Sequence, residues 1–294
     1  MKKLLLLLIF PVLACSQKPA VKLDTNQLIE DLRFISSDAT EGRRTGTEGN
    51  RIAREYLVTR FQEVEAQPFQ DSYTHEFTFE NRRTQEEVNA INVIAKVDGK
   101  TDSMIVITAH YDHLGKRDSL IFNGADDDAS GTAALLALAD YFVKEKPRHT
   151  LVFAAFDAEE MGLQGARAFV EDSVMLSKVK LNINMDMISQ NDSSEIYAAG
   201  TYHYPELKPI LESIDTVGLK LLFGHDTPGS GSDDWTFSSD HGPFHSKGVP
   251  FVYFGVEDHK HYHRATDEFE TIPQDFYKAS VQLILNAIIA FDEQ

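Results

Sequence analysis

The sequence predicts an α/β fold in which helices cover both faces of a mixed, largely parallel sheet. From Met104 onward, short apolar runs alternate with helical stretches, which is the pattern of strands joined by crossover helices. Several of these runs end directly at a His, Asp or Glu. The carboxyl ends of strands in open α/β sheets are where ligands collect. We therefore expect a three-layer α/β/α sandwich with a polar site along one sheet edge.

Composition fits one globular domain with a large core, or two small ones, and disfavours nucleic acid as a partner. The chain has 294 residues, of which 42% are hydrophobic, enough for a large core. Its formal net charge is −18. Nucleic acids and anionic membrane surfaces attract basic patches, so both are disfavoured as partners. The acidity is mild support for cationic substrates or bound metal ions.

The first residues predict an export signal. Lys2 and Lys3 precede an apolar run too short to span a bilayer, and a small-residue cleavage site follows. Residues 12–15 resemble the lipobox of bacterial lipoproteins, and Cys15 is the only cysteine. We expect a signal peptide over residues 1–14, lipidation of Cys15, a tether over 15–22 and a catalytic domain over 23–294. This implies a membrane-anchored protein of the cell envelope, outside the cytoplasm, with Ser16 favouring the outer membrane. An ordinary signal peptide containing a Cys is the alternative.

Four elements are expected before Met104. A helix capped within residues 24–26 continues to Ile35, and an amphipathic helix covers 50–64. Alternating patterns over 73–79 and 90–97 predict strands.

Strands and helices then alternate. The expected strands are 104–108, 151–156, 181–185 and 251–254, and the expected helices are 129–143, 163–172, 204–216 and 274–290. Residues 224–245 are irregular and are expected to form loops over the site. Trp235, Phe237 and Phe244 are candidates to line a specificity pocket, although core burial explains each equally well.

Ligand-type side chains follow several of these elements. His110 ends the first strand, and Asp112 two residues later can hold one ring nitrogen while the other faces a metal. Three strand ends, one helix start and one loop deliver such residues, which lie in segments 110–112, 126–128, 157–160, 186 and 262–263. His and carboxylates without thiolates suit Zn²⁺ or a similar catalytic ion. The excess of acids suits two ions that share a carboxylate.

Glu159 and Glu160 form the informative pair. Adjacent carboxylates at a strand end point in different directions, so one can bind a metal while the other serves as a base. In isolation, such a pair is better explained as a solvated helix start.

An ordered set of motifs resembles the M28 metallopeptidases, bacterial zinc aminopeptidases with two co-catalytic ions. The segments that carry the resemblance are Glu41-Gly42-Arg43, His110-Tyr111-Asp112, Gly124 to Gly131, Glu159 to Gly165, Asn184 to Met187, Ser239 to Phe244, Gly248-Val249-Pro250 and Tyr262-His263. The resemblance implies a zinc-peptidase-like fold and the removal of N-terminal residues from peptides.

The resemblance also implies two Zn²⁺ ions. His110 and Asp186 would hold one ion, and Glu160 and His263 the other. Asp127 would bridge both, and the peptide bond that follows it is expected to be cis.

Three further residues receive catalytic roles from the resemblance. Glu159 would act as general base on the bridging water that attacks the scissile carbonyl, and would then protonate the leaving amine. Tyr262 would steady the oxyanion, and Asp112 would orient His110. The free α-amine of the substrate would sit near the ion held by Asp186.

The remaining nearby histidines are assigned no role, because the five-ligand set is complete without them. They are His113, His225, His241, His245, His259 and His261, of which His241 is the best candidate for the wall of the site.

Four alternatives to this function can be weighed against the sequence. A glutaminyl cyclase resembles this family but uses one zinc. An M28-type carboxypeptidase would use Arg264 to anchor a carboxylate. An M20-type enzyme needs a large inserted lid, for which the 76 residues between Asp186 and His263 are too few. A metal-free binding module predicts a gap among the ligands or at the base, and the sequence has none.

Overall fold

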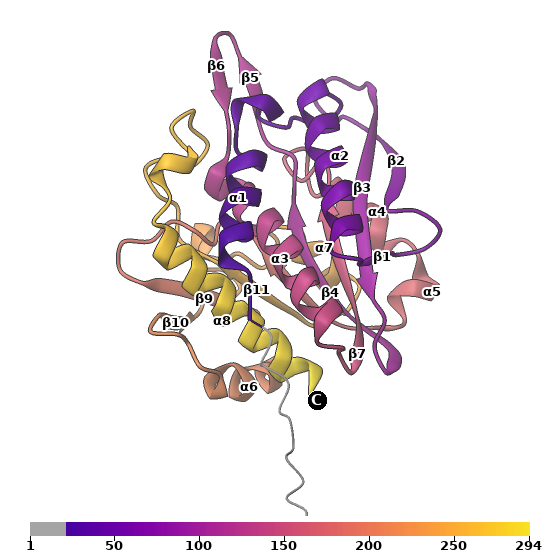
Figure 1. Ribbon diagram of the computed structural model, residues 1–294, viewed down its shortest axis with the longest axis vertical. Helices are drawn as coiled ribbons and strands as arrows, with labels where there is room; N and C mark the ends of the chain where they lie inside the picture. The colour runs from indigo at the N-terminus through magenta and orange to yellow at the C-terminus, as the bar shows by residue number, and fades with distance from the viewer. Residues whose placement is uncertain (1–21) are drawn as a thin grey trace, which may run out of the picture.

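A nine-stranded sheet forms the middle layer of the protein (Figure 1). The structure is a computed structural model that describes residues 22–294, so the signal peptide, Cys15 and nearly all of the tether lie outside the described residues. The strand order is β1 (Gln67–Pro68), β3 (Glu87–Val97), β7 (His149–Phe156), β4 (Thr101–His110), β8 (Val179–Met185), β11 (Phe251–Gly255), β9 (Glu195–Ala199) and β10 (Lys220–Phe223), with β2 (Thr74–Glu80) beside β3. The four central strands β7, β4, β8 and β11 are parallel. Antiparallel pairs flank them.

Helices cover both faces of this sheet, which confirms the predicted α/β/α sandwich. One face carries α1 (Thr25–Ile35), α2 (Glu48–Glu63), α3 (Gly131–Lys144), α6 (Lys208–Ser213) and α8 (Gln274–Asp292). The other carries α4 (Gln164–Val170), α5 (Ser173–Leu176) and α7 (His241–Ser246). A hairpin of β5 (Gly115–Arg117) and β6 (Leu120–Phe122) stands apart from the sheet. Short helical turns cover Asp38–Thr40, Ala125–Ser130, Pro205–Leu207, Gly231–Asp233 and Phe269–Thr271.

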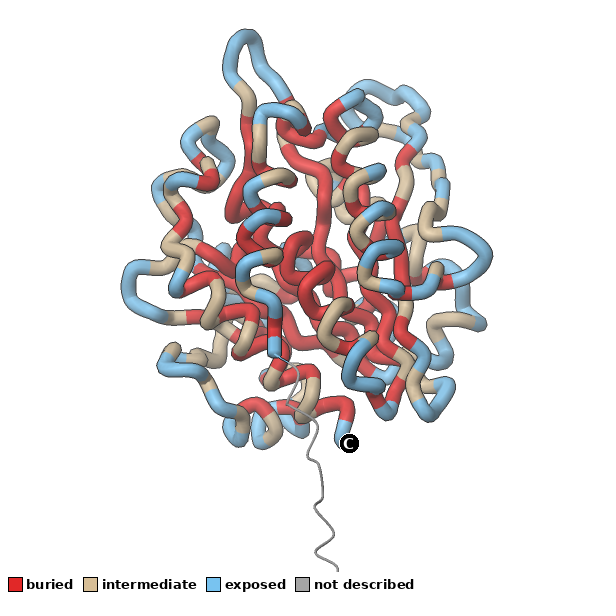
Figure 2. Tube along the Cα trace, in the orientation of Figure 1, coloured by how far each residue is buried: buried red, intermediate tan, exposed pale blue. Residues whose placement is uncertain are grey.

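The central strands are apolar on both faces. In β4, Ile105 and Ile107 pack with the α1–α3–α8 layer, whereas Met104 and Val106 pack with the α4–α7 layer. A strand buried on both sides needs a continuous apolar run, and this explains why residues 104–108 do not alternate. Figure 2 shows the buried chain concentrated in these strands and in α3, with the exposed chain at the rim.

Most predicted elements are confirmed, with shifts at their ends. Asp24 caps α1, as expected, and Thr47 caps α2. The predicted helix 204–216 is shorter, because α6 ends at Ser213. Strand β10, at the edge of the sheet, and its neighbour β9 were not predicted. No helix among residues 22–294 has the length and apolar character needed to cross a bilayer.

A buried arginine ties together the segments that lead into the site. Arg43 is fully buried, and its guanidinium donates to the main-chain oxygens of Ile35, Tyr111, Asn123 and Gly124. These oxygens belong to the end of α1, the segment after β4 and the segment before the Ala125–Ser130 turn. One side chain thus satisfies four acceptors, each of which would be costly to leave buried and unpaired.

Replacing Arg43 by Met should therefore lower the free energy of unfolding by about 3–5 kcal/mol, because the carbonyls lose their donors. Urea unfolding measures this change. Arg44→Met, at the exposed neighbouring position, is the matched control and should change stability by less than about 0.5 kcal/mol. Equal losses in the two variants would contradict this role for Arg43.

Candidate metal centre

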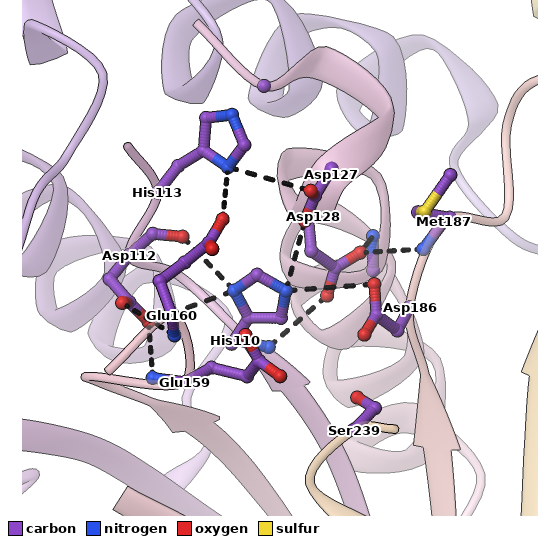
Figure 3. A network of polar contacts seen from close by, with 12 residues as sticks. His110, Asp112, His113, Asp127, Asp128, Glu159, Glu160, Asp186, Met187 and Ser239 are labelled. Carbon is purple, nitrogen blue, oxygen red and sulfur yellow. Dashed lines mark hydrogen bonds and ion pairs between the residues drawn. The ribbon is translucent and has the colours of Figure 1, made fainter. Parts of the chain in front are cut away.

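His110, Asp127 and Asp186 form the first cluster of donor atoms. The Nε2 atom of His110 lies 3.2 Å from Oδ1 of Asp127 and 3.6 Å from Oδ1 of Asp186. Figure 3 shows the His110 ring facing both carboxylates. The cluster forms because His110 ends β4 and Asp186 follows β8, the parallel neighbour of β4. All three residues are buried and could hold one metal ion.

A second cluster shares Asp127. The Nε2 atom of His263 lies 3.1 Å from Oδ2 of Asp127 and 3.7 Å from Oε1 of Glu160. Glu160 follows β7, the other parallel neighbour of β4. Asp127 thus offers one oxygen to each cluster, which is the arrangement expected of a bridging carboxylate. The structure brings together all five residues that the sequence nominated as ligands.

His113 also reaches the second cluster, which the sequence analysis missed. Its Nδ1 atom lies 2.8 Å from Oε1 of Glu160 and 3.7 Å from Oδ2 of Asp127 (Figure 3). The expectation that His113 has no part in the site is therefore not what the structure shows. The signal available in the sequence was its position three residues after His110.

The three consecutive aspartates 126–128 have different roles in the site. Asp127 points into it, and the Asp127–Asp128 peptide bond is cis, as the resemblance implied. The outer two anchor the turn. Asp128 accepts the main-chain N–H groups of His110, Gly131 and Met187. Asp126 accepts the main-chain N–H and the side-chain hydroxyl of Ser189, and its carboxylate lies 2.9 Å from Nε2 of His259. Asp267 accepts the N–H groups of Asp126 and Asp127.

Asp112 orients His110 and also supports the glutamate pair. The Nδ1 atom of His110 lies 3.1 Å from the main-chain oxygen of Asp112 and 3.7 Å from its Oδ1. The carboxylate itself accepts the main-chain N–H groups of Glu159, at 3.0 Å, and Glu160, at 3.3 Å. A partner on Nδ1 leaves Nε2 of His110 for the cluster. The main-chain carbonyl oxygen of Asp112 therefore makes the closer contact that orients His110. The Asp112 carboxylate mainly holds the main chain of Glu159 and Glu160.

The donor set fits divalent cations. It combines imidazole nitrogens with carboxylate oxygens and has no thiolate, the choice that suits catalytic zinc. Oε1 of Glu160 and Nδ1 of His113 are buried without a hydrogen-bond partner among the described residues. Buried polar atoms rarely lack partners, and a bound ion is one explanation for those that do.

The clusters lie in a cavity of about 550 Å³ with an acidic lining. Its acidic residues are Asp127, Glu159, Glu160, Asp186, Asp233, Glu257 and Asp258. No Lys or Arg lines this cavity within the part of the chain that the structure describes. The cavity therefore favours a positively charged group over a negatively charged one.

Of the three aromatic residues expected to line a specificity pocket, only Trp235 lines this cavity. Phe244 is fully buried in the core and Phe237 is 59% exposed. His241 is not a lining residue, because it stacks against Phe251 and Tyr253 behind the wall. His225 lines the cavity in its place and stacks on Trp235 with ring centroids 3.7 Å apart.

Glu159 and Tyr262 line the cavity beside the donor clusters. Burial, together with Asp186 and other nearby carboxylates, raises the pKa of Glu159 well above its usual range. Tyr262 stacks on His263 with ring centroids 3.9 Å apart. Burial and the carboxylates raise the pKa of Tyr262 too, so its phenol stays protonated and able to donate.

Comparisons with known proteins first define the class. The fold matches a Zn-dependent exopeptidase from Parabacteroides distasonis, with a TM-score of 0.75, 17% identity, and coverage of 92% of this chain and 99% of that chain. It also matches the glutaminyl cyclase of Fimbriiglobus ruber, with a TM-score of 0.76, 18% identity, and coverage of 93% and 97%. The chain thus has the α/β/α fold shared by zinc exopeptidases and cyclases.

Sequence comparison then gives the family. Residues 92–288 match the profile of Peptidase family M28, and the chain belongs to this family, which confirms the resemblance noted in the sequence. Aminopeptidase YwaD of Bacillus subtilis is 28% identical over 255 residues, which cover 82% of this chain and 52% of that protein. The chain spans about half the length, or less, of the curated relatives it matches.

Zinc binding should release protons from His110 and His263. Burial opposes the charge of His110, but Glu159 and Asp186 raise its pKa well above the usual range. Contact with Asp127 likewise raises the pKa of His263. Both shifts favour the protonated ring in the metal-free protein, whereas zinc takes only the neutral form. Zinc affinity should therefore rise as the pH increases.

Isothermal titration calorimetry in two buffers of different ionisation enthalpy measures the released protons. The apparent binding enthalpy should differ between the buffers. A buffer-independent enthalpy, with equal affinity at about pH 6 and pH 8, would contradict the raised pKa values of His110 and His263.

Proposed function

We propose that this protein is an aminopeptidase that holds two Zn²⁺ ions. His110 and Asp186 would bind one ion, Glu160 and His263 the other, and Asp127 both. The observation that carries the choice of substrate is the cavity, which has an acidic lining and lacks Lys and Arg among the described residues. Such a cavity accommodates the ammonium group of a free N-terminus, whereas a C-terminal carboxylate needs a cation. Membership of family M28 supports hydrolysis of peptides.

Glu159, Tyr262 and Asp112 would have separate roles in the hydrolysis. A bound zinc pair supplies Lewis acidity and lowers the pKa of water. The Glu159 carboxylate takes a proton from the attacking water and then passes it to the leaving amine nitrogen. The Tyr262 hydroxyl donates to the carbonyl oxygen as negative charge develops there. Asp112 holds His110 and the main chain of Glu159 in place throughout.

The alternatives are less well supported. Arg264 is exposed and does not line the cavity, so a carboxypeptidase would lack its proposed anchor. A metal-free binding module would not need all five ligand residues and Glu159 to converge. The cyclase shares the fold, but the second donor cluster around Glu160 favours an enzyme with two ions.

A peptide panel separates these activities. The protein should hydrolyse aminoacyl-nitroanilides and C-terminally amidated peptides, and should not act on N-acetylated peptides. Release of C-terminal residues from N-acetylated peptides would instead indicate a carboxypeptidase. Loss of ammonia from an N-terminal Gln, without hydrolysis of the other substrates, would indicate a cyclase.

Two neighbouring variants test the roles within this activity. Glu159→Gln should lower kcat by about 10²–10⁴-fold while both zinc ions stay bound, because only the base is lost. Glu160→Gln should lose one ion as well as activity. Glu171→Gln, at an exposed position after α4, is the control and should retain both. Unchanged hydrolysis in Glu159→Gln would remove Glu159 from the mechanism.

We also propose that a lipid on Cys15 anchors the enzyme to a cell-envelope membrane, outside the cytoplasm. The support is the sequence of residues 2–15, with its basic start, apolar run and lipobox-like end. Wild-type protein should incorporate labelled fatty acid and fractionate with membranes. Cys15→Ser should incorporate none, and an equally labelled Cys15→Ser variant would contradict the anchor.

A further inference from the structure

We propose that His113 is a fourth protein ligand of the ion held by Glu160 and His263, and that it binds through Nδ1. The inference rests on the proposed two-zinc centre and adds one residue to its five ligands. It makes the two positions unequal: His110, Asp186 and Asp127 would supply three donors to one ion, whereas the other would have four.

The His113 ring is fixed where the second cluster needs it. It is buried, 1% exposed, in the segment that follows β4. Gly124 packs so closely against the ring that a Cβ there would lie 2.5 Å from Cδ2 and 2.7 Å from Cγ. A ring held this tightly presents Nδ1 in one direction, toward Glu160 (Figure 3).

The spacing of the four donor atoms fits a shared ion. From Nδ1 of His113, the distances are 2.8 Å to Glu160 Oε1 and 3.7 Å to Asp127 Oδ2. From Nε2 of His263, the distances to the same two oxygens are 3.7 Å and 3.1 Å. Tetrahedral ligands about 2.1 Å from one zinc ion lie about 3.4 Å from one another. The four measured distances bracket that value.

A hydrogen bond does not account for the closest of these contacts. Nδ1 of His113 and Oε1 of Glu160 are 2.8 Å apart, yet both are buried without a hydrogen-bond partner. An ordinary donor and acceptor at this distance would be aligned with each other. Two ligands of one ion are instead close neighbours whose lone pairs point at the ion. A shared cation therefore explains why Nδ1 of His113 and Oε1 of Glu160 both lack partners, whereas Nε2 of His113 stays buried without one among residues 22–294.

The unequal positions have a functional consequence. Sites saturated by four protein ligands retain zinc, whereas catalytic sites keep a position open for water or substrate. The ion beside His113 should therefore be the more tightly held. The position at His110 and Asp186 should exchange first and stay accessible to substrate.

Zinc titration against a chromophoric chelator tests the inference with two variants. His113→Asn places an amide N–H near the Nδ1 position, so it keeps a hydrogen-bond donor but loses the ligand. His113→Leu keeps the volume and loses both. Each variant should bind one zinc with wild-type affinity and the second at least about 10–100-fold more weakly. His149→Asn, which changes a buried histidine at the start of β7, should bind two ions as the wild type does.

A measurement on the wild-type chain avoids reliance on the folding of variants. In ¹⁵N-histidine spectra, zinc should shift His110 and His263 at Nε2 and one further ring, His113, at Nδ1. No Nδ1-bound ring, or wild-type affinity for both ions in His113→Asn, would overturn the inference. Fewer than two zinc ions bound by the wild type would instead overturn the proposed two-zinc centre itself.

Discussion

The structure depends on holding several carboxylates around one cavity that, among residues 22–294, no Lys or Arg lines. Asp127, Glu160 and Asp186 converge there, and Glu159 lines the same cavity. Burying unpaired charge is costly, so such a cluster needs a compensating cation. The imidazoles supply at most part of that charge. The hydrogen bonds of the Arg43 guanidinium all go to main-chain oxygens rather than to these carboxylates. Divalent ions at the two donor clusters would remove the repulsion and use every carboxylate as a ligand or a base.

The fold makes this convergence possible through its parallel centre. Strands β7, β4 and β8 are neighbours that end at the same sheet edge, so Glu160, His110 and Asp186 meet although they are distant in sequence. Asp127 and His263 lie in irregular segments, whose main chain must be held in place by hydrogen bonds. Asp126 and Asp267 fix the turn of Asp127, and the carboxylate of Asp112 fixes the turn of Glu159 and Glu160.

Sequence reasoning was most successful where local pattern and position coincide. Apolar runs that end at a polar residue locate a strand and its end together, so His110 and Asp186 could be placed on one edge. The pairing of Asp127 with Glu160 and His263 came from resemblance to a family, because nothing local relates a helix start to a loop more than 100 residues away.

The remaining features depend on tertiary packing, which a single sequence does not reveal. His113 reaches Glu160 because the segment after β4 turns back against Gly124, and no periodicity encodes that turn. Residues 224–245 were expected to form loops, but α7 begins at His241 within them. Phe237 before this helix is exposed, whereas Phe244 in it is fully buried in the core. The edge strand β10 is only four residues long and half-buried, so its pattern is too short to read.

The central claim is that two metal ions share Asp127. The most direct measurement is a crystallographic anomalous-difference map of the protein with zinc, recorded at the zinc absorption edge. The account predicts two peaks about 3.5–4 Å apart, one beside His110 and Asp186 and the other beside Glu160 and His263. A single peak, or none within coordination distance of Asp127, would contradict it.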